Sequence, residues 1–538
     1  MCEVTKYNFK QKLPEIKSAI DNAKLVAIDL EFSALYPIKN EQPSLFDSSS
    51  ERYTKLKKNL EKVIPVQLGL TTFSYNADRN FYEGTIYNVY LKPGAFPSMH
   101  TSFYFQSECI NFLTLYDFNF NKFAYESVPF LNKTTETELR KNLKNSELTE
   151  MYSNYKMELE DIFDKFGEEV RIWYEKAPVG DKLSLPKVYE KYRGNLEIMY
   201  FIQKSFRARF KNLWTKCDED FVVFKVSDED LKALECEDID EDLVDDLLGF
   251  TQVFRHLVKS KKPLIGHNCL LDVMLLINSF ECDLPSSFSE FKKLSHSLFP
   301  TIYDTKRICF ELKNLIPEEK RYHDTSLGDL FEYFKNGTGR HVVLNSPAID
   351  AVSESNLGNF HEAGWDSYCS GYVFIRLAYL NICKKYPASK RFVSSELIGG
   401  MVEHRNKINM ARGYVNHINL EGQDPPSSRP PWLIIESNRN KTINISQVTS
   451  ILSSYGCVEI KRLSYKTNGA LVAVDNFGNA RRIINTFKTN KDFKVRQYNV
   501  FKHSPVMRAF VFSGITISGA LLLWLTHSVT KRVVGEFF

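Results

Sequence analysis

The stretch at residues 25–32, Leu-Val-Ala-Ile-Asp-Leu-Glu-Phe, constrains the fold more than any other part of the chain. Apolar and β-branched residues lead directly into two carboxylates, which is typical of a buried strand with acid at its end. Strand side chains alternate between faces, so Asp29 and Glu31 point the same way. Their mutual repulsion on an apolar face is costly unless a cation lies between them.

Hard oxygen ligands without a nearby Cys or His cluster favour Mg²⁺ or Mn²⁺ over zinc at this strand. The stretch alone is equally consistent with a strand that runs into an ordinary exposed turn. A metal site here therefore needs more carboxylates and a proton acceptor elsewhere in the chain.

Composition places the chain among ordinary globular proteins. Its 538 residues are enough for two to four domains, with 43% hydrophobic and 25% charged residues. The net charge of +4 is too small to establish a nucleic-acid partner. Ten cysteines without metal-finger spacing indicate free thiols in a reducing compartment. The N-terminal residues lack a basic start followed by an apolar run, so no secretory signal is expected.

The first part of the chain predicts a three-stranded meander. Residues 63–73 and 86–91 are strand-like and close enough in sequence to pair antiparallel with residues 25–32. Residues 108–116 predict a helix. This opening resembles an RNase H-like exonuclease core.

Residues 135–235 change character and predict a charged, mainly helical insert. Within it, residues 201–214 interleave cations with aromatic rings, a pattern that suits phosphate contact and base stacking. A solvated helix with an apolar back face is the alternative interpretation.

Two later segments supply further acids and a histidine. A short strand ends at Gly266, His267 and Asn268 turn the chain, and the helix that follows carries Asp272 near its start. A helix running to about residue 382 has His361 in its approach and Asp366 in its first turns. On its own, Asp272 would be explained as an acid that compensates the helix dipole. On its own, His361 would be explained as a structural or exposed histidine.

Together, Asp29, Glu31, Asp272, Asp366 and His361 match the pattern of DEDD exonucleases of the His subtype. From the first strand to about residue 400, the chain resembles the poly(A)-specific ribonuclease family. Four segments carry the resemblance: Val-Ala-Ile-Asp-Leu-Glu-Phe, Gly-His-Asn-Cys-Leu-Leu-Asp, Asp304-Thr-Lys and His-Glu-Ala-Gly-Trp-Asp.

The resemblance implies a two-metal 3′-to-5′ exoribonuclease that releases nucleoside 5′-monophosphates. The four carboxylates would hold two Mg²⁺ ions, or Mn²⁺, at the scissile phosphate. His361 would be the general base, since imidazole titrates near neutral pH. Phe32 and Phe112 are candidates to hold the terminal ribose, although each also suits a core position.

The insert corresponds to the place where family members carry a small RNA-binding domain named for a conserved arginine and histidine. Its signature is degenerate here, because Arg207 is followed four residues later by Lys211. Residues 432–498 then read strand, helix, strand, strand, helix, strand, which predicts an RRM-like domain. Its third strand, residues 469–474, lacks the aromatic residues that stack on bases, so packing or partner binding is favoured over base recognition.

A mostly apolar run at residues 509–525, about 17 residues long, lies near the lower limit for a membrane-spanning helix. It predicts a C-terminal tail anchor spanning about residues 509–526, with the enzyme facing the cytosol. The mitochondrial outer membrane is the expected location and the endoplasmic reticulum the alternative. A buried helix of the RRM-like region is the competing interpretation.

The predicted fold class is therefore α/β: an RNase H-like DEDD exonuclease core with a helical inserted module, an RRM-like α+β domain and a C-terminal transmembrane helix. The predicted domains are residues 1–134 and 236–412 for the core, 135–235 for the insert, 413–504 for the RRM-like domain and 505–538 for the anchor.

An anchored member resembles the piRNA-trimming, PARN-like branch of this family. That resemblance implies a single-stranded RNA 3′ end as substrate, in piRNA precursors bound to a PIWI protein. It also implies a Tudor-domain membrane partner, contact with the lipid bilayer, and a homodimer as in other family members. The alternatives are a poly(A)-specific mRNA deadenylase, a membrane-tethered RNA-binding adaptor with an inert site, and an enzyme that needs a partner for activity.

Overall fold

The computed structural model describes residues 1–510 except 97–98, 100, 145–155, 218–219, 235–238, 353–357, 387–390 and 439–440. Contacts within the chain divide it into two compact units. Unit 1 consists of Met1–Gln42, Tyr53–Met410 and His417–Gln423. Unit 2 consists of Pro43–Arg52, Ala411–Asn416 and the residues from Asp424 onward.

The core of unit 1 is a mixed sheet in the order β1-β4-β3-β2-β9-β10. The predicted meander is confirmed, because β2, β3 and β4 pair antiparallel in sequence order. Strands β9 and β10 extend the sheet in parallel with β2, which gives the RNase H-like arrangement. Strands β5 and β11 pair with β4. The bounds are β1 (Cys2–Val4), β2 (Leu25–Phe32), β3 (Pro65–Asn76), β4 (Phe81–Pro93), β5 (Val128–Phe130), β9 (Leu264–Gly266), β10 (Ile302–Asp304) and β11 (Ala348–Ala351).

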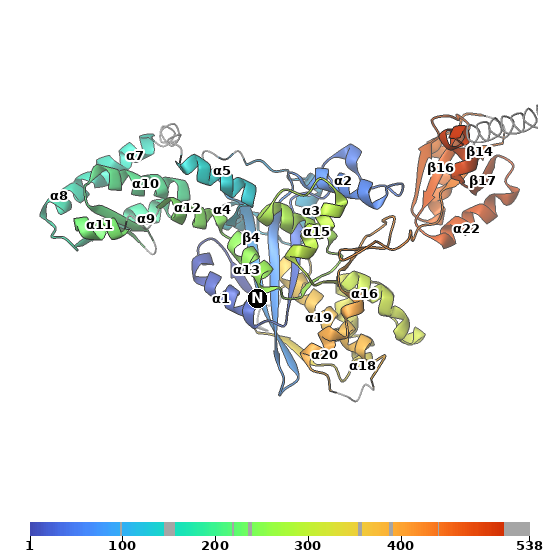
Figure 1. Cartoon of the computed structure of the whole chain (residues 1–538), viewed down its shortest axis with the longest axis horizontal. Coiled ribbons are helices and arrows are strands. Elements are labelled where there is room, and N and C mark those ends of the chain that lie inside the picture. The colour runs from blue at the N-terminus through green and yellow to red at the C-terminus, as the bar shows by residue number, and fades with distance from the viewer. Residues whose placement is uncertain are drawn as a thin grey trace, which may run out of the picture. The chain divides into compact units, whose positions relative to one another are not determined.

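Helix α19 (Ala363–Ile382) packs against β2, β3, β4 and β9 (Figure 1). Its residues are buried on nearly every side, because it lies between the sheet and helices α16 and α17. The other helices of this core are α1 (Phe9–Asn22), α3 (Ser107–Leu115), α4 (Phe120–Glu126), α13 (Thr251–Ser260), α14 (Leu270–Leu276), α15 (Phe288–Leu298), α16 (Thr305–Leu312), α17 (Leu327–Lys335), α18 (Gly339–Val342) and α20 (Ser394–Gly399). Helix α2 (Ser49–Leu60) begins in unit 2 and ends in unit 1, and strands β12 (Lys407–Asn409) and β13 (His417–Asn419) pair with each other.

Two glycines allow α19 to approach the sheet closely. A Cβ on Gly69 of β3 would overlap the carbonyl of Ala363 at the start of α19. A Cβ on Gly371 of α19 would overlap the ring of Phe73 on β3. Gly69 pairs directly with Asp29 in the sheet, so the helix reaches the sheet beside the acidic strand.

The insert has its own core of helices around a three-stranded sheet, β6-β8-β7. Its elements are α5 (Lys133–Lys144), α7 (Lys156–Ile162), α8 (Glu168–Lys176), β6 (Lys182–Ser184), α9 (Pro186–Tyr192), α10 (Leu196–Arg209), β7 (Leu213–Cys217), β8 (Phe221–Lys225), α11 (Asp228–Leu234) and α12 (Ile239–Leu248). All three strands pair antiparallel. The insert therefore contains a sheet as well as helices and is not purely helical.

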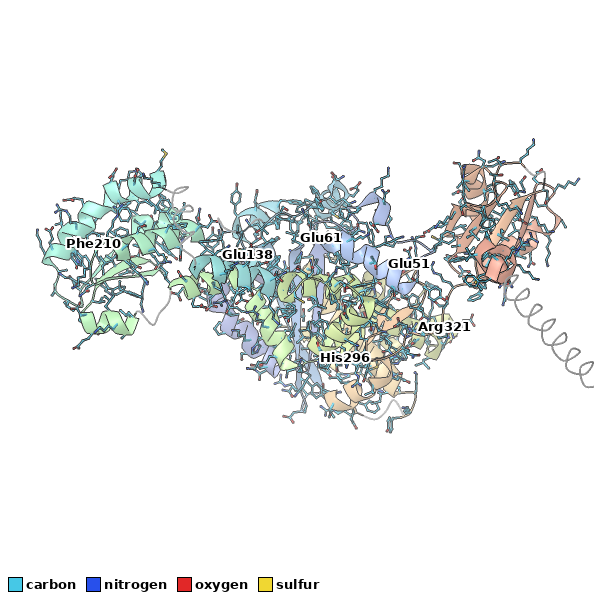
Figure 2. All side chains as sticks on the ribbon, turned by 45° about the horizontal axis from the view of Figure 1, so that its top comes forward. Glu51, Glu61, Glu138, Phe210, His296 and Arg321 are labelled. Carbon is cyan, nitrogen blue, oxygen red and sulfur yellow. The ribbon has the colours of Figure 1, made fainter. Side chains whose placement is uncertain are left out.

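The cations and rings of residues 201–214 pack on one another within the insert. The Arg207 guanidinium lies 3.5 Å from the ring centroid of Trp214 and donates to Thr215 Oγ1 at 2.9 Å. The Arg209 guanidinium lies 3.6 Å from the ring of Phe163. Phe210, which is labelled in Figure 2, follows α10. Its ring centroid lies 5.4 Å from that of Tyr174. These contacts agree with the alternative interpretation of a helix with an apolar back face, since the rings serve the insert's own packing.

Unit 2 contains the predicted strand-helix-strand-strand-helix-strand order, with the sheet order β15-β16-β14-β17. The elements are β14 (Leu433–Ser437), α21 (Ile445–Leu452), β15 (Val458–Arg462), β16 (Gly469–Val474), α22 (Phe477–Thr486), β17 (Phe493–Gln497) and the short helix α23 (Val500–His503). Both longer helices contribute to the same apolar cluster on one face of the sheet (Figure 1). This topology is RRM-like.

The predicted membrane span at residues 509–526 lies outside the described residues, apart from Ala509 and Phe510 at its start. Among the helices described, none is both long and apolar enough to cross a membrane. The nine cysteines within the described part of the chain form no disulfide with one another.

Candidate active site

Strand β2 carries the first two acids of the site. Asp29 pairs with Gly69, and Glu31 pairs with Gln67 of β3. Glu31 is 9% exposed and Asp29 is half-buried. Paired residues of neighbouring strands share a face, so both carboxylates lie on the face of the sheet that receives α19.

Asp272 is positioned by a tight turn after β9. Asn268 adopts a left-handed backbone with φ of 59°, a conformation that asparagine tolerates better than most residues. The fully buried carboxylate of Asp304 accepts hydrogen bonds from the backbone N–H groups of Asn268 at 2.9 Å and Cys269 at 3.2 Å. Asp304 also accepts from the backbone of Asn409 at 2.9 Å. This network holds the turn from which α14 starts, and Asp272 lies in the first turn of that helix.

His361 and Asp366 lie at the start of α19, as predicted. His361 has a positive φ of 67°, a strained backbone for a residue of this size. Its N–H donates to Asp366 Oδ2 at 3.1 Å. Its imidazole centroid lies 4.0 Å from the ring of Tyr116 and 5.0 Å from the ring of Phe112, which therefore limit its rotation.

The structure brings all five predicted residues into one cluster. One ligand atom each from Glu31, His361 and Asp366 lies within 4.8 Å of the others. Asp29 interacts electrostatically with Asp366, Asp272 and Glu31. Residues from three separate parts of the sequence thus meet on one face of the sheet.

The family follows from comparison of the whole chain with known proteins. A family model described as CAF1 family ribonuclease matches residues 4–374. That match spans more than half of the 538 residues. The chain belongs to the CAF1 ribonuclease family.

Several ribonucleases are similar to the chain over most of its length. It is 30% identical over 543 residues to the pre-piRNA 3′-exonuclease trimmer of Bombyx mori, covering 99% of this chain and 100% of that protein. It is 29% identical over 524 residues to the poly(A)-specific ribonuclease PNLDC1 of Homo sapiens, covering 94% and 97%. It is 27% identical over 528 residues to the poly(A)-specific ribonuclease PARN of Xenopus laevis, covering 92% and 80%. The predicted resemblance and the enzyme class, a 3′-to-5′ exoribonuclease, are confirmed.

Burial dominates the electrostatics of this CAF1 family site. It raises the pKa of Asp29 and Glu31 well above the ordinary values, and the neighbouring carboxylates raise them further. Burial also raises the pKa of Asp272 and that of Asp366 to about 7. In contrast, burial lowers the pKa of the His361 imidazole, which is therefore neutral at pH 7.

The donor set fits divalent cations. Asp366 Oδ1 is buried and has no hydrogen-bond partner among the described residues, although Oδ2 is satisfied. Leaving a buried carboxylate oxygen unpaired is costly, and a cation beside it would remove the cost. Carboxylate oxygens are ligands that Mg²⁺ and Mn²⁺ prefer.

Several residues that shape the ribonuclease site escaped prediction as site residues. Tyr116 packs on His361 beside Phe112, which is also one of the two candidates to hold the terminal ribose. Asp304 enters the sequence pattern only as part of a family segment, and its five backbone donors reveal its structural role. The buried amides Gln67 and Asn88 gave no signal in the sequence, because a polar residue in a strand does not reveal its partner.

Proposed function

We propose that this ribonuclease trims the 3′ ends of piRNA precursors with a two-metal mechanism. The observation that carries the catalytic part is the convergence of Asp29, Glu31, Asp272, His361 and Asp366 on one face of the sheet. The similarity to the Bombyx mori trimmer over 99% of this chain supports the substrate class.

Asp29, Glu31, Asp272 and Asp366 would hold two Mg²⁺ ions, with Mn²⁺ as a substitute. When bound, such ions supply charge stabilisation at the scissile phosphate and acidify the attacking water. The protein contributes the fixed positions of the carboxylates, which come from a strand and from the first turns of two helices.

His361 is the proposed general base. Its neutral imidazole accepts the proton of the attacking water as the new P–O bond forms and the bond to the 3′ oxygen breaks. The rings of Tyr116 and Phe112 restrict the imidazole, and the hydrogen bond to Asp366 fixes its backbone. The product of each step is a nucleoside 5′-monophosphate.

The proposed substrate is the single-stranded 3′ end of a precursor held by a PIWI protein, with a Tudor-domain protein as membrane partner. The apolar run at residues 509–525 supports a C-terminal anchor, and we propose the mitochondrial outer membrane as its location. Separating mitochondrial membranes from cells that express the full chain, with and without this run, tests the location. Recovery of the complete chain in the soluble fraction would contradict it.

A general poly(A) deadenylase is the second candidate, because several relatives are poly(A)-specific ribonucleases. The two functions differ in base preference. A deadenylase should degrade an oligo(A) tail much faster than mixed sequence, whereas a trimmer should show little preference.

The deciding experiment uses the purified full chain, Mg²⁺ and two 5′-labelled RNAs, one of mixed sequence and one ending in oligo(A). A ladder that shortens from the 3′ end on both RNAs, absent with EDTA or with Asp29→Asn, is expected. A ladder on oligo(A) alone would favour the deadenylase. If neither RNA shortened, the free chain would be either an inert adaptor or dependent on a partner, and adding PIWI-bound precursor would separate these two.

A further inference from the structure

Helix α19 begins without a cap from its own segment. Glu362 occupies the N-cap position, and its side chain makes no capping hydrogen bond. The first N–H groups of a helix lack intrahelical partners and need acceptors from elsewhere. In this protein the acceptors come from two strands of the sheet.

Two buried amide side chains provide these acceptors. Gln67 Oε1 on β3 accepts from the backbone N–H of Ala363 at 3.0 Å. Asn88 Oδ1 on β4 accepts from the backbone N–H of Gly364 at 3.1 Å. Gln67 is 2% exposed and Asn88 is fully buried, so water cannot replace either acceptor.

Both amides are oriented by a second hydrogen bond. Asn88 Nδ2 donates to Glu362 Oε1 at 3.0 Å, so Asn88 holds the helix start through both ends of its amide. The Gln67 side chain is hydrogen-bonded to the hydroxyl of Tyr90, the residue opposite it on β4. With Oε1 committed to Ala363, Nε2 of Gln67 is the donor in that bond.

The amides also lie in the same rows of the sheet as the acids. Gln67 pairs with Glu31, and Asn88 pairs with Gly69, which pairs in turn with Asp29. The helix start is therefore fixed by β3, which is next to the strand that carries Asp29 and Glu31, and by β4 on the other side of β3. A shift of α19 along its axis by one residue, about 1.5 Å, would break both bonds.

We propose that Gln67 and Asn88 are positioning residues that set the location of His361 and Asp366 relative to Asp29 and Glu31. This inference rests on the proposed catalytic role of these four residues. An amide that only satisfied a buried N–H would affect stability alone. A positioning residue also affects turnover and cation binding, because displacement of about 1 Å at a reacting group can cost about 100-fold in rate.

The test compares three variants of the full chain. Gln67→Met removes the acceptor at nearly constant volume, and Gln67→Glu restores an acceptor at the same place. Thr72→Val is the matched control, because Thr72 is a similarly buried polar residue on the opposite face of β3. The measurements are kcat and KM with Mg²⁺, Mn²⁺ binding by electron paramagnetic resonance, and hydrogen exchange of the amides at residues 363–364.

In Gln67→Met we expect kcat to fall about 10- to 100-fold with little change in KM, Mn²⁺ to bind more weakly, and the amides at residues 363–364 to exchange faster. Gln67→Glu should recover most of the turnover, and Thr72→Val should behave as wild type. Should Gln67→Met not fold, Asn88→Leu and Gln67→Glu are measured in the same way.

Wild-type kcat and Mn²⁺ affinity in Gln67→Met, or equal losses in Thr72→Val, would overturn the positioning role while the wild-type enzyme still cleaves RNA. Absence of Mg²⁺-dependent cleavage by the wild-type enzyme would instead overturn the proposed function on which the inference rests.

Discussion

Asp366 accepts a hydrogen bond from the backbone N–H of His361 through one carboxylate oxygen, whereas the other oxygen is buried without a hydrogen-bond partner among the described residues. The first oxygen is thus used to fix the base, and the second is available to a cation. This division explains why the two residues occur five positions apart at the start of one helix. The hydrogen bond keeps the histidine, which precedes α19, in a fixed relation to the acid in the first turn of that helix.

Replacing His361 with alanine should lower kcat about 10²- to 10⁴-fold with little effect on KM, because a general base acts mainly in the transition state. Steady-state kinetics on a 5′-labelled RNA measures the effect. His256→Ala is the matched control, since His256 is paired with Asp21 in a separate surface interaction. An equal loss in both variants would exclude a specific role for His361.

The stability of the metal-free protein should fall as the pH rises through about 7. Burial raises the pKa of Asp272 and Asp366 to about 7, so the folded state holds these protons more tightly than the unfolded chain. The resulting stabilisation is complete below the unfolded pKa of about 4 and is lost as the carboxyl groups ionise. Mg²⁺ would compensate the buried charges, so it should raise the melting temperature more at pH 8 than at pH 6.

Differential scanning fluorimetry with Mg²⁺ and with EDTA at the two pH values measures this difference. Asp272→Asn, which cannot ionise, should reduce it. A Mg²⁺ effect of equal size at both pH values would show that these carboxyl groups do not bind the ion.

Local patterns explain why the acids and the histidine were predictable. The D-x-E of β2 lies within a single strand, so its spacing alone implies a shared face. The H-x-x-x-x-D segment ends in the first turn of α19, whereas His361 precedes that helix, so the segment was recognisable through the family resemblance. The contacts of Gln67, Asn88 and Asp304 join residues far apart in the sequence, and no local pattern encodes them.

In the insert, by contrast, the sequence pattern does not decide between two structures. Alternation of cations and rings in residues 201–214 is equally compatible with stacking on bases and with stacking within the protein. The structure shows that Arg207 lies on Trp214 and donates to Thr215. Likewise, nothing in the composition of residues 43–52 predicts that they pack within unit 2.

Gly69→Ala should destabilise the protein by on the order of 1–3 kcal/mol and reduce activity, because the added methyl overlaps the carbonyl of Ala363 and pushes α19 away from Asp29. Chemical denaturation and the RNA assay measure the two effects. Gly399→Ala in α20 is the control, since a Cβ there meets no atom within 4 Å. Its stability should change by less than about 1 kcal/mol. Full activity in Gly69→Ala would mean that close helix approach is not required.

Arg429→Met should loosen residues 43–52 from unit 2. Arg429 is 9% exposed, and its guanidinium donates to the carbonyls of Leu45 and Gly413. Methionine keeps much of the volume but leaves both carbonyls without this donor, at a cost on the order of 1–3 kcal/mol. Burial and the nearby Arg52 already lower the pKa of Arg429 to about 10. The folded state of unit 2 therefore disfavours the charged form of this side chain.

Hydrogen exchange and limited proteolysis of the full chain should therefore show faster exchange and new cleavage within residues 43–52 of Arg429→Met. Arg481→Met, at an exposed position of α22, is the matched control and should leave the segment protected. Because residues 33–42 connect β2 to this segment, RNA cleavage is measured on the same samples. Lost protection with unchanged kcat would show that the segment serves the integrity of unit 2 and not catalysis. Unchanged protection in Arg429→Met would contradict the role assigned to this arginine.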